Sequence, residues 1–292
     1  MVNRMNKFEK EKTDVAWGKL MSRLQEDNLL VKQNEYHSNK HNAMSFTKTK
    51  KVLVAGLSLA AMIAVLFLLN ISFFKNEKNN VAMILEKNNE SSSLVTTLSD
   101  GSIVYLAKYG TIAYPKVFSN KTRNVNLKGE AFFDVAKNRN KPFIITTPEA
   151  IIEVLGTSFS ITKNENIPFR LVVRSGKVKV TDRKTNQIVY VEKNEGVSLS
   201  SGRLESFISN ENPIKNFVKD FRFKDQNLKS IVEALNSISS DGKIELSGNI
   251  DNRILTVAFS GENIDEMAKL ISLALNLSIE KKNNTIYLSD KQ

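Results

Sequence analysis

The sequence predicts a single-pass membrane protein with an extracytoplasmic all-β sandwich or barrel domain, followed by a small α+β domain. Three observations lead to this fold class. Residues 52–69 form an uncharged apolar run, residues 94–208 carry many short alternating segments, and residues 217–290 add two segments of helical periodicity. Hydrophobic residues make up 41% of the 292-residue chain, which is sufficient for folded domains.

Residues 1–51 are expected to form a cytoplasmic arm that ends in a polar tether. Trp17, Leu20, Met21 and Leu24 are spaced as one face of an amphipathic helix. A short helix cannot bury such a face alone. We therefore expect it to bind a groove on a cytosolic partner, with a helix lying on the membrane surface or folded back on the chain as the alternative.

The apolar run from Val52 to Leu69 is expected to be a transmembrane helix, which the following apolar side chains extend to residues 52–74. A helix of this length covers most of the ~30 Å hydrocarbon core, and a soluble helix would show a polar face. Lys and Arg are more frequent before the run than after it, which places the N-terminus in the cytoplasm. We expect an inner-membrane protein with a periplasmic C-terminus.

Composition excludes several classes of function. The chain has no cysteine and only two histidines, His37 and His41, which lie in the polar tether. Disulfides, cysteine-ligated zinc, iron–sulfur clusters and thiol catalysis are excluded, and we expect neither a metal nor a cofactor. The net charge of +11 would suit nucleic acid, but it is densest beside the expected membrane helix. No DNA-reading element is recognisable in the sequence, so direct binding of nucleic acid is not expected.

Residues 75–93 are expected to form a stalk with a short helix at 81–85, and residues 94–208 to form the all-β domain. Apolar and polar residues alternate within its segments, as at Val178 and Val180, which are separated by lysines. Gly, Pro, Asn and Ser separate the segments at short intervals, a pattern typical of antiparallel sandwiches and barrels.

Residues 217–290 are expected to form a small α+β domain with the element order βαββαββ and both helices on one face of a sheet. Asp225 is the expected N-cap of the first helix, and Asn263 with Glu266 is the expected capping box of the second. The dipeptide Asn283-Asn284 is expected to close the final hairpin.

Residues 98–180 also contain a series of short motifs in a fixed order. They are Leu98-Ser99-Asp100-Gly101-Ser102, Tyr114-Pro115 with Phe118, Arg123 to Val135 (RNVNLKGEAFFDV), Lys141-Pro142-Phe143, Val154 to Phe159 (VLGTSF) and Ser175-Gly176-Lys177-Val178. This series resembles the FecR-type anti-sigma regulators, in particular the branch common in Bacteroidetes, although Ser99 replaces the usual proline and residues 107–110 depart from the pattern. Residues 217–290 resemble the small C-terminal domain of that branch, which is similar to the short signalling domain of secretins and TonB-dependent receptors.

The resemblance implies a transmembrane anti-sigma factor that controls genes for uptake of an iron–siderophore or a glycan. Its partners would be an extracytoplasmic-function sigma factor, bound by the arm at Trp17, Leu20, Met21 and Leu24, and the signalling domain of a TonB-dependent outer-membrane receptor. The alternative is a membrane-anchored periplasmic adaptor that assembles a transport complex without a sigma factor. A carbohydrate-active β-sandwich is a weaker rival, because no catalytic constellation is recognisable.

Some FecR-like proteins are similar to self-processing proteins that split at a Gly-Thr bond, and Gly156-Thr157 matches that position. Glycine permits an unusual backbone, and the threonine hydroxyl can attack the preceding carbonyl to give an ester that water opens. The alternative is a simple turn or bulge followed by a strand residue. Apart from this self-cleavage, we expect no enzymatic activity.

Overall fold

The computed structural model describes residues 82–163 and 168–291, which are mostly β-strand with two helices. The arm residues named above and the expected span 52–74 lie outside this part of the chain. Within it, neither helix is long and apolar enough to cross a membrane.

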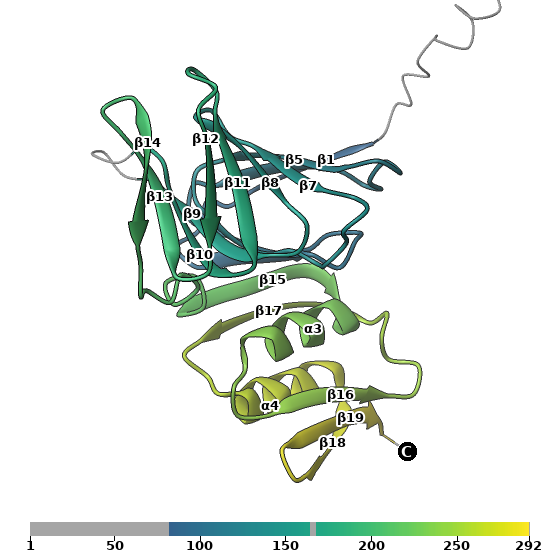
Figure 1. Cartoon of the computed structure of the whole chain (residues 1–292). Helices are drawn as coiled ribbons and strands as arrows, with labels where there is room; N and C mark the ends of the chain where they lie inside the picture. The colour runs from purple at the N-terminus through teal and green to yellow at the C-terminus, as the bar shows by residue number, and fades with distance from the viewer. Residues whose placement is uncertain (1–81, 164–167, 292) are drawn as a thin grey trace, which may run out of the picture. The chain divides into compact units, whose positions relative to one another are not determined.

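Strands dominate the first part of the described chain (Figure 1). They are β1 (Met83–Lys87), β2 (Ser93–Thr97), β3 (Ile103–Leu106), β4 (Thr111–Pro115), β5 (Arg123–Lys128), β6 (Ala131–Asp134), β7 (Phe143–Thr146), β8 (Ala150–Val154), β9 (Ser158–Thr162), β10 (Arg170–Ser175), β11 (Lys177–Asp182), β12 (Ile188–Glu192), β13 (Glu195–Ser200) and β14 (Arg203–Ile208). The C-terminal module that follows comprises β15 (Asp220–Asn227), α3 (Leu228–Ile238), β16 (Lys243–Ser247), β17 (Ile254–Ser260), α4 (Ile264–Leu275), β18 (Leu277–Lys282) and β19 (Thr285–Asp290). The order of elements in this module is the predicted βαββαββ.

Two sheets form a sandwich. One has seven strands in the order β1-β4-β5-β7-β8-β11-β12, and the other has nine in the order β14-β13-β10-β9-β6-β3-β2-β15-β17. Most neighbours pair antiparallel, whereas β5–β7 and β2–β15 pair parallel. Inward side chains from both sheets form the first core, including Leu106, Val125, Phe133, Phe143 and Phe159. The predicted alternation is confirmed at Val178 and Val180, which are fully buried.

The nine-stranded sheet runs from the sandwich into the C-terminal module, because β15 pairs with β2 and β17 pairs with β15. A second core therefore forms on the outer face of this sheet, where Val95, Ile103, Tyr105 and Phe132 pack with residues of α3 and α4. Strands β2, β3 and β6 are buried on both faces, which explains why β3 (IVYL) and most of β6 (AFFD) are continuous apolar runs, while β2 (SLVTT) also buries small polar residues.

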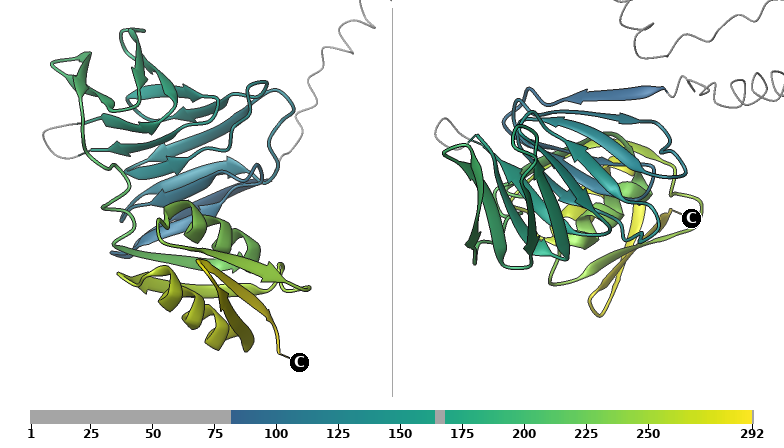
Figure 2. Two further views of the ribbon diagram at one scale, coloured as in Figure 1. Left: turned by 60° about the horizontal axis from the view of Figure 1, so that its bottom comes forward. Right: turned by 45° about the horizontal axis from the view of Figure 1, so that its top comes forward.

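The C-terminal module differs from the prediction in how its strands are grouped. Strands β16, β19 and β18 form a separate three-stranded sheet, while β15 and β17 belong to the nine-stranded one. Helix α3 contacts β15 and β16, and α4 contacts β17, β18 and β19, so the helices lie between two sheets (Figures 1 and 2). The prediction of both helices on one face of a single sheet was wrong, because pairing between distant segments places the strands of the module in two different sheets.

Two local predictions were also wrong. Residues 83–87, expected within a stalk and partly as a helix, form strand β1, which pairs antiparallel with β4. The N-cap of α3 is Asn227, whose side chain accepts from the Ser230 amide, and not Asp225, which has a φ of 50° at a bulge in β15. Both differences arise from pairing with residues far away in the sequence.

The remaining local predictions in this module are confirmed. Asn263 and Glu266 form the expected capping box of α4. Asn283 takes a positive φ of 54° in the turn between β18 and β19, as the hairpin prediction requires.

Candidate functional site

The predicted self-cleavage site lies in the bend between β8 and β9, where the backbone requires glycine. Gly156 has a φ of 150°, and a Cβ atom there would lie 2.6 Å from the Cα of Lys137. The loop after β6 holds this bend from one side, since the amide of Asn138 donates to the Leu155 carbonyl at 2.7 Å. Gly156 is therefore fixed by close packing of two backbones, and a larger residue would have to displace one of them.

Thr157 is almost fully buried, with 3% of its surface exposed. Its hydroxyl donates a hydrogen bond to the Lys177 carbonyl at 3.1 Å. Gly176, with a φ of 85°, lies against the same peptide: a Cβ atom there would be 2.8 Å from Thr157 Oγ1 and 2.9 Å from the Gly156 carbonyl oxygen. The hydroxyl and the carbonyl that would react therefore both lie against Gly176. A residue with a side chain at this position would collide with them.

A surface hollow of about 350 Å³ opens beside this peptide. Its lining includes Leu155, Gly156, Thr157, Lys177 and Tyr190. Water would be needed to open an ester formed at Thr157, and the hollow lies directly beside this residue. The hydroxyl proton is held by a main-chain carbonyl rather than by a base, so the attack requires this hydrogen bond to be exchanged first.

The next residue along the chain belongs to a different polar group. The Ser158 hydroxyl donates to the Asp134 carboxylate at 2.5 Å, and the Ser175 hydroxyl donates to Ser158 at 3.1 Å. Glu130, four residues before Asp134, accepts instead from the amide of Lys163 at 2.8 Å. Glu130 and Asp134 therefore serve separate partners and do not form a pair of acid–base carboxylates.

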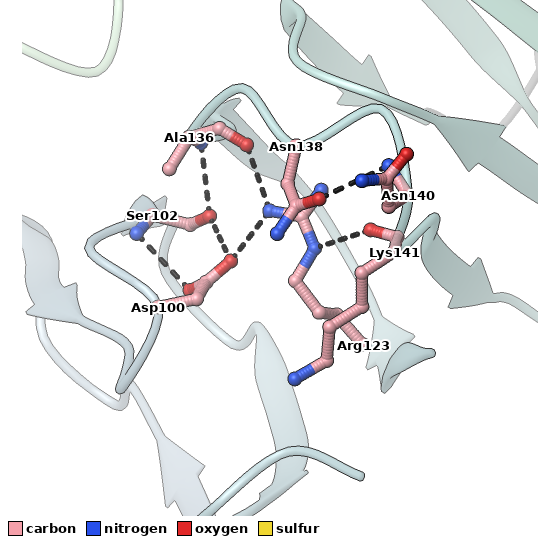
Figure 3. A network of polar contacts seen from close by, with 7 residues as sticks. All are labelled: Asp100, Ser102, Arg123, Ala136, Asn138, Asn140 and Lys141. Carbon is pink, nitrogen blue, oxygen red and sulfur yellow. Dashed lines mark hydrogen bonds and ion pairs between the residues drawn. The ribbon is translucent and has the colours of Figure 1, made fainter. Parts of the chain in front are cut away.

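Three of the sequence motifs of the β domain meet at a buried arginine. Arg123 begins β5, and its side chain is 1% exposed. It donates from Nη1 to Oδ2 of Asp100 and to the Ala136 carbonyl, each at 2.7 Å, and from Nε to the Lys141 carbonyl at 2.9 Å (Figure 3). The guanidinium also lies 5.3 Å from the ring centroid of Phe143. One side chain at the start of β5 therefore ties the β2–β3 turn to the loop between β6 and β7.

Asp100 is itself held by the turn in which it lies. Its carboxylate accepts from the amide of Ser102 at 3.1 Å and from the Ser102 hydroxyl at 2.7 Å, and that hydroxyl accepts from the Ala136 amide at 3.1 Å (Figure 3). The arrangement is a structural clasp, because most of its polar atoms bond to one another, although Nη2 of Arg123 is buried without a hydrogen-bond partner. In the sequence, Asp100 and Ser102, Arg123, and Lys141 belong to three separate motifs. Their contacts with one another were not predicted.

Other predicted site residues cannot be placed. Trp17, Leu20, Met21 and Leu24 of the arm, and Val52 and Leu69 at the ends of the expected membrane run, lie outside the described residues. Within residues 82–163 and 168–291, no group of three or more His, Cys, Asp or Glu side chains is arranged to hold a metal ion.

By its architecture the described part of the chain is a two-sheet β-sandwich whose nine-stranded sheet continues into an α/β module. Residues 87–179 of this sandwich match the family model described as FecR protein. These residues form a FecR domain, as the motif series predicted.

The chain is also similar to two crystal structures of a protein described as "a putative anti-sigma factor" from Parabacteroides distasonis. They share 22% identity with the chain, cover 72% of it and 100% of their own length, and give TM-scores of 0.44 and 0.43. A search of curated proteins returned no match.

Proposed function

We propose that the protein is a transmembrane anti-sigma regulator of an extracytoplasmic-function sigma factor. The FecR domain over residues 87–179 is the observation that supports this function most directly. The apolar run 52–69 would span the inner membrane, with the arm in the cytoplasm and the FecR domain in the periplasm. The signalling domain of a TonB-dependent receptor is the proposed periplasmic partner, and uptake of an iron–siderophore or a glycan is the proposed process under control.

The arm is the part that would hold the sigma factor. Trp17, Leu20, Met21 and Leu24 share one helical face, and a Trp on such a face is a typical anchor in a groove of a partner. Lys19 lies off this face and offers a matched control in the same helix.

Co-purification of the full-length chain with the co-expressed sigma factors of its host tests this function. We expect the unchanged chain and Lys19→Ala to retain one sigma factor, identified by mass spectrometry. We expect Trp17→Ala to bind it about 30-fold more weakly, since a buried anchor contributes about 2 kcal/mol. If the unchanged chain retains no sigma factor, the proposal fails and the periplasmic adaptor becomes the better description.

We also propose that the chain can cleave itself between Gly156 and Thr157, and that it catalyses no other reaction. In this step Thr157 Oγ1 bonds to the Gly156 carbonyl carbon, the C–N bond breaks, and the hydroxyl proton passes to the leaving amine. Water then hydrolyses the ester, which yields the Gly156 carboxylate and a free amine and hydroxyl on Thr157. The packing of the peptide against Gly176 and Lys137 supports a constrained ground state at this bond.

Intact-mass analysis of the purified full-length chain tests the cleavage. We expect fragments that end at residue 156 and begin at residue 157, in the unchanged chain and in Thr157→Ser. Thr157→Val keeps the shape but lacks the nucleophile and should stay whole, while Thr181→Val on β11 should cleave normally. An unchanged chain that remains a single species on prolonged incubation would refute self-cleavage and leave the anti-sigma proposal untouched.

A further inference from the structure

The turn between β1 and β2 is organised by one buried asparagine. Asn88 has no exposed surface (0%). Its side chain and main chain form hydrogen bonds of 2.7–3.1 Å with Glu90, Ser92, Leu106, Tyr109 and Gly110. Because these bonds reach both the β1–β2 turn and the β3–β4 turn, Asn88 fixes the point at which β1 joins the rest of the sandwich.

A residue of the C-terminal module completes this cluster. Nη2 of Arg222, on β15, donates to Oδ1 of Asn88 at 3.1 Å. Nε of the same guanidinium lies 3.0 Å from Oε2 of Glu90. The side chain of Arg222 is 14% exposed and that of Glu90 is 63% exposed. The contact therefore has a buried end at Asn88 and an end at Glu90 that solvent reaches.

A groove of about 620 Å³ flanks this contact. Residues of β1 and the β1–β2 turn, including Leu85, Glu86 and Glu90, form one part of its lining, and Arg222 and Lys224 of β15 form another. The groove gives the Arg222 side chain space to leave Asn88 without opening either hydrophobic core.

Strand β1 is held more loosely than the strands inside the sheets. It is an edge strand of the seven-stranded sheet and pairs with β4 from Met83 to Lys87. Leu85 is 71% exposed, and Ile84 is only partly buried against the core. Strands with little burial open locally at a lower free energy than the core does.

We propose that Arg222 is a latch through which the C-terminal module controls the attachment of β1, the strand that connects the sandwich to residues 1–81. While Arg222 contacts Asn88 and Glu90, the turn after β1 stays closed and β1 stays paired with β4. When β15 shifts, Arg222 withdraws and β1 opens more often. The shift is confined to a short junction, because β15 pairs with β2 only from Phe221 to Phe223. The proposal concerns this fold alone and does not depend on the identity of any partner.

Hydrogen exchange of the purified full-length chain, followed by mass spectrometry, tests the latch. In Arg222→Gln we expect amides of β1 (Met83–Lys87) to exchange about fivefold faster, as loss of one hydrogen bond to a buried acceptor implies. Amides of β11 (Lys177–Asp182), whose Val178 and Val180 belong to the same core, should exchange at the unchanged rate.

Two further variants keep the test informative. Glu90→Gln removes only the charge at the exposed end and should speed exchange of β1 about twofold without affecting folding. Arg170→Gln breaks the pair between Arg170 and Glu211 elsewhere on the nine-stranded sheet and should leave β1 unchanged. The latch is refuted if β1 is unaffected in Arg222→Gln and Glu90→Gln, or if β1 and β11 accelerate by the same factor, as in a global loss of stability.

Discussion

The buried pair between Arg123 and Asp100 leads to the sharpest prediction about stability. Asp100→Asn keeps the size of the side chain and one acceptor oxygen, but it removes the charge that faces a guanidinium with 1% exposure. The uncompensated charge of Arg123 would then remain inside the sandwich, where water cannot solvate it. We therefore expect the substitution to destabilise the FecR domain strongly although it changes almost no packing.

The structure allows the size of this effect to be estimated. Removing one partner of a buried ion pair costs about 3–5 kcal/mol. Arg123 would keep its hydrogen bonds to the carbonyls of Ala136 and Lys141, and Asp100 is 13% exposed, so the lower end applies. A loss of about 3 kcal/mol corresponds to a fall in Tm of about 6–12 °C for a folded unit of about 200 residues.

Urea unfolding of a fragment covering residues 78–292, which form one compact unit, measures this loss. Arg123→Met and the double variant with Asp100→Asn complete a double-mutant cycle, for which we expect a coupling free energy of about 2 kcal/mol. Glu211→Gln, which breaks the exposed pair with Arg170, is the control and should cost less than about 1 kcal/mol. The reasoning fails if Asp100→Asn costs no more than this control.

Three further outcomes follow from other parts of the structure. Gly156→Ala should lower Tm and abolish any cleavage, because its Cβ would lie 2.6 Å from the Cα of Lys137, and differential scanning fluorimetry with intact mass checks both. The amide of Thr185 donates to Asp182 and lowers the pKa of that carboxyl. The resulting stabilisation is present at neutral pH and is lost as the pH falls below about 5. Asp182→Asn should therefore flatten the acid limb of a curve of Tm against pH. Burial raises the pKa of Tyr105 above its ordinary value, so the unfolded chain ionises first and stability falls in alkaline solution; Tyr105→Phe should reduce that fall in the same assay.

Two local predictions in the C-terminal module are confirmed because neighbouring residues determine them, whereas the N-cap predicted at Asp225 was displaced by the bulge in β15. The capping box of Asn263 and Glu266 and the turn at Asn283 depend on residues a few positions apart, and both are present. The strand at Met83–Lys87 had no such signal, because its partner, Thr111–Pro115, lies far along the chain. A short apolar segment between polar residues suits a helical turn or an edge strand equally well, and only pairing decides between them.

The candidate site likewise has one part that was predicted from the sequence and other parts that were not. The pair Gly156-Thr157 was located through its match to the Gly-Thr bond of self-processing FecR-like proteins, and Gly156 there has a φ of 150°. The close approach of Gly176 and the clasp around Arg123 could not be predicted, since both bring together loops separated by many residues. The available signal for Arg123 was its phase in an alternating strand, because it falls on the same face as the buried Val125 and Leu127 and a charge there needs a buried partner.

The shared sheet changes what the C-terminal module can do. Val95, Ile103, Tyr105 and Phe132 project from the outer face of the sandwich and are 0–5% exposed because the module covers them. A sandwich that ended before the module would present these side chains to water as one apolar patch, which soluble domains avoid.

The two parts therefore complete one another's cores, and β15 joins them through main-chain hydrogen bonds to β2. A partner that binds the module and moves it would also act on this junction, beside which Arg222 contacts Asn88. Because Asn88 also fixes the turn after β1, the proposed latch would let a movement of β15 reach β1 through a few polar contacts while the sandwich core stays packed.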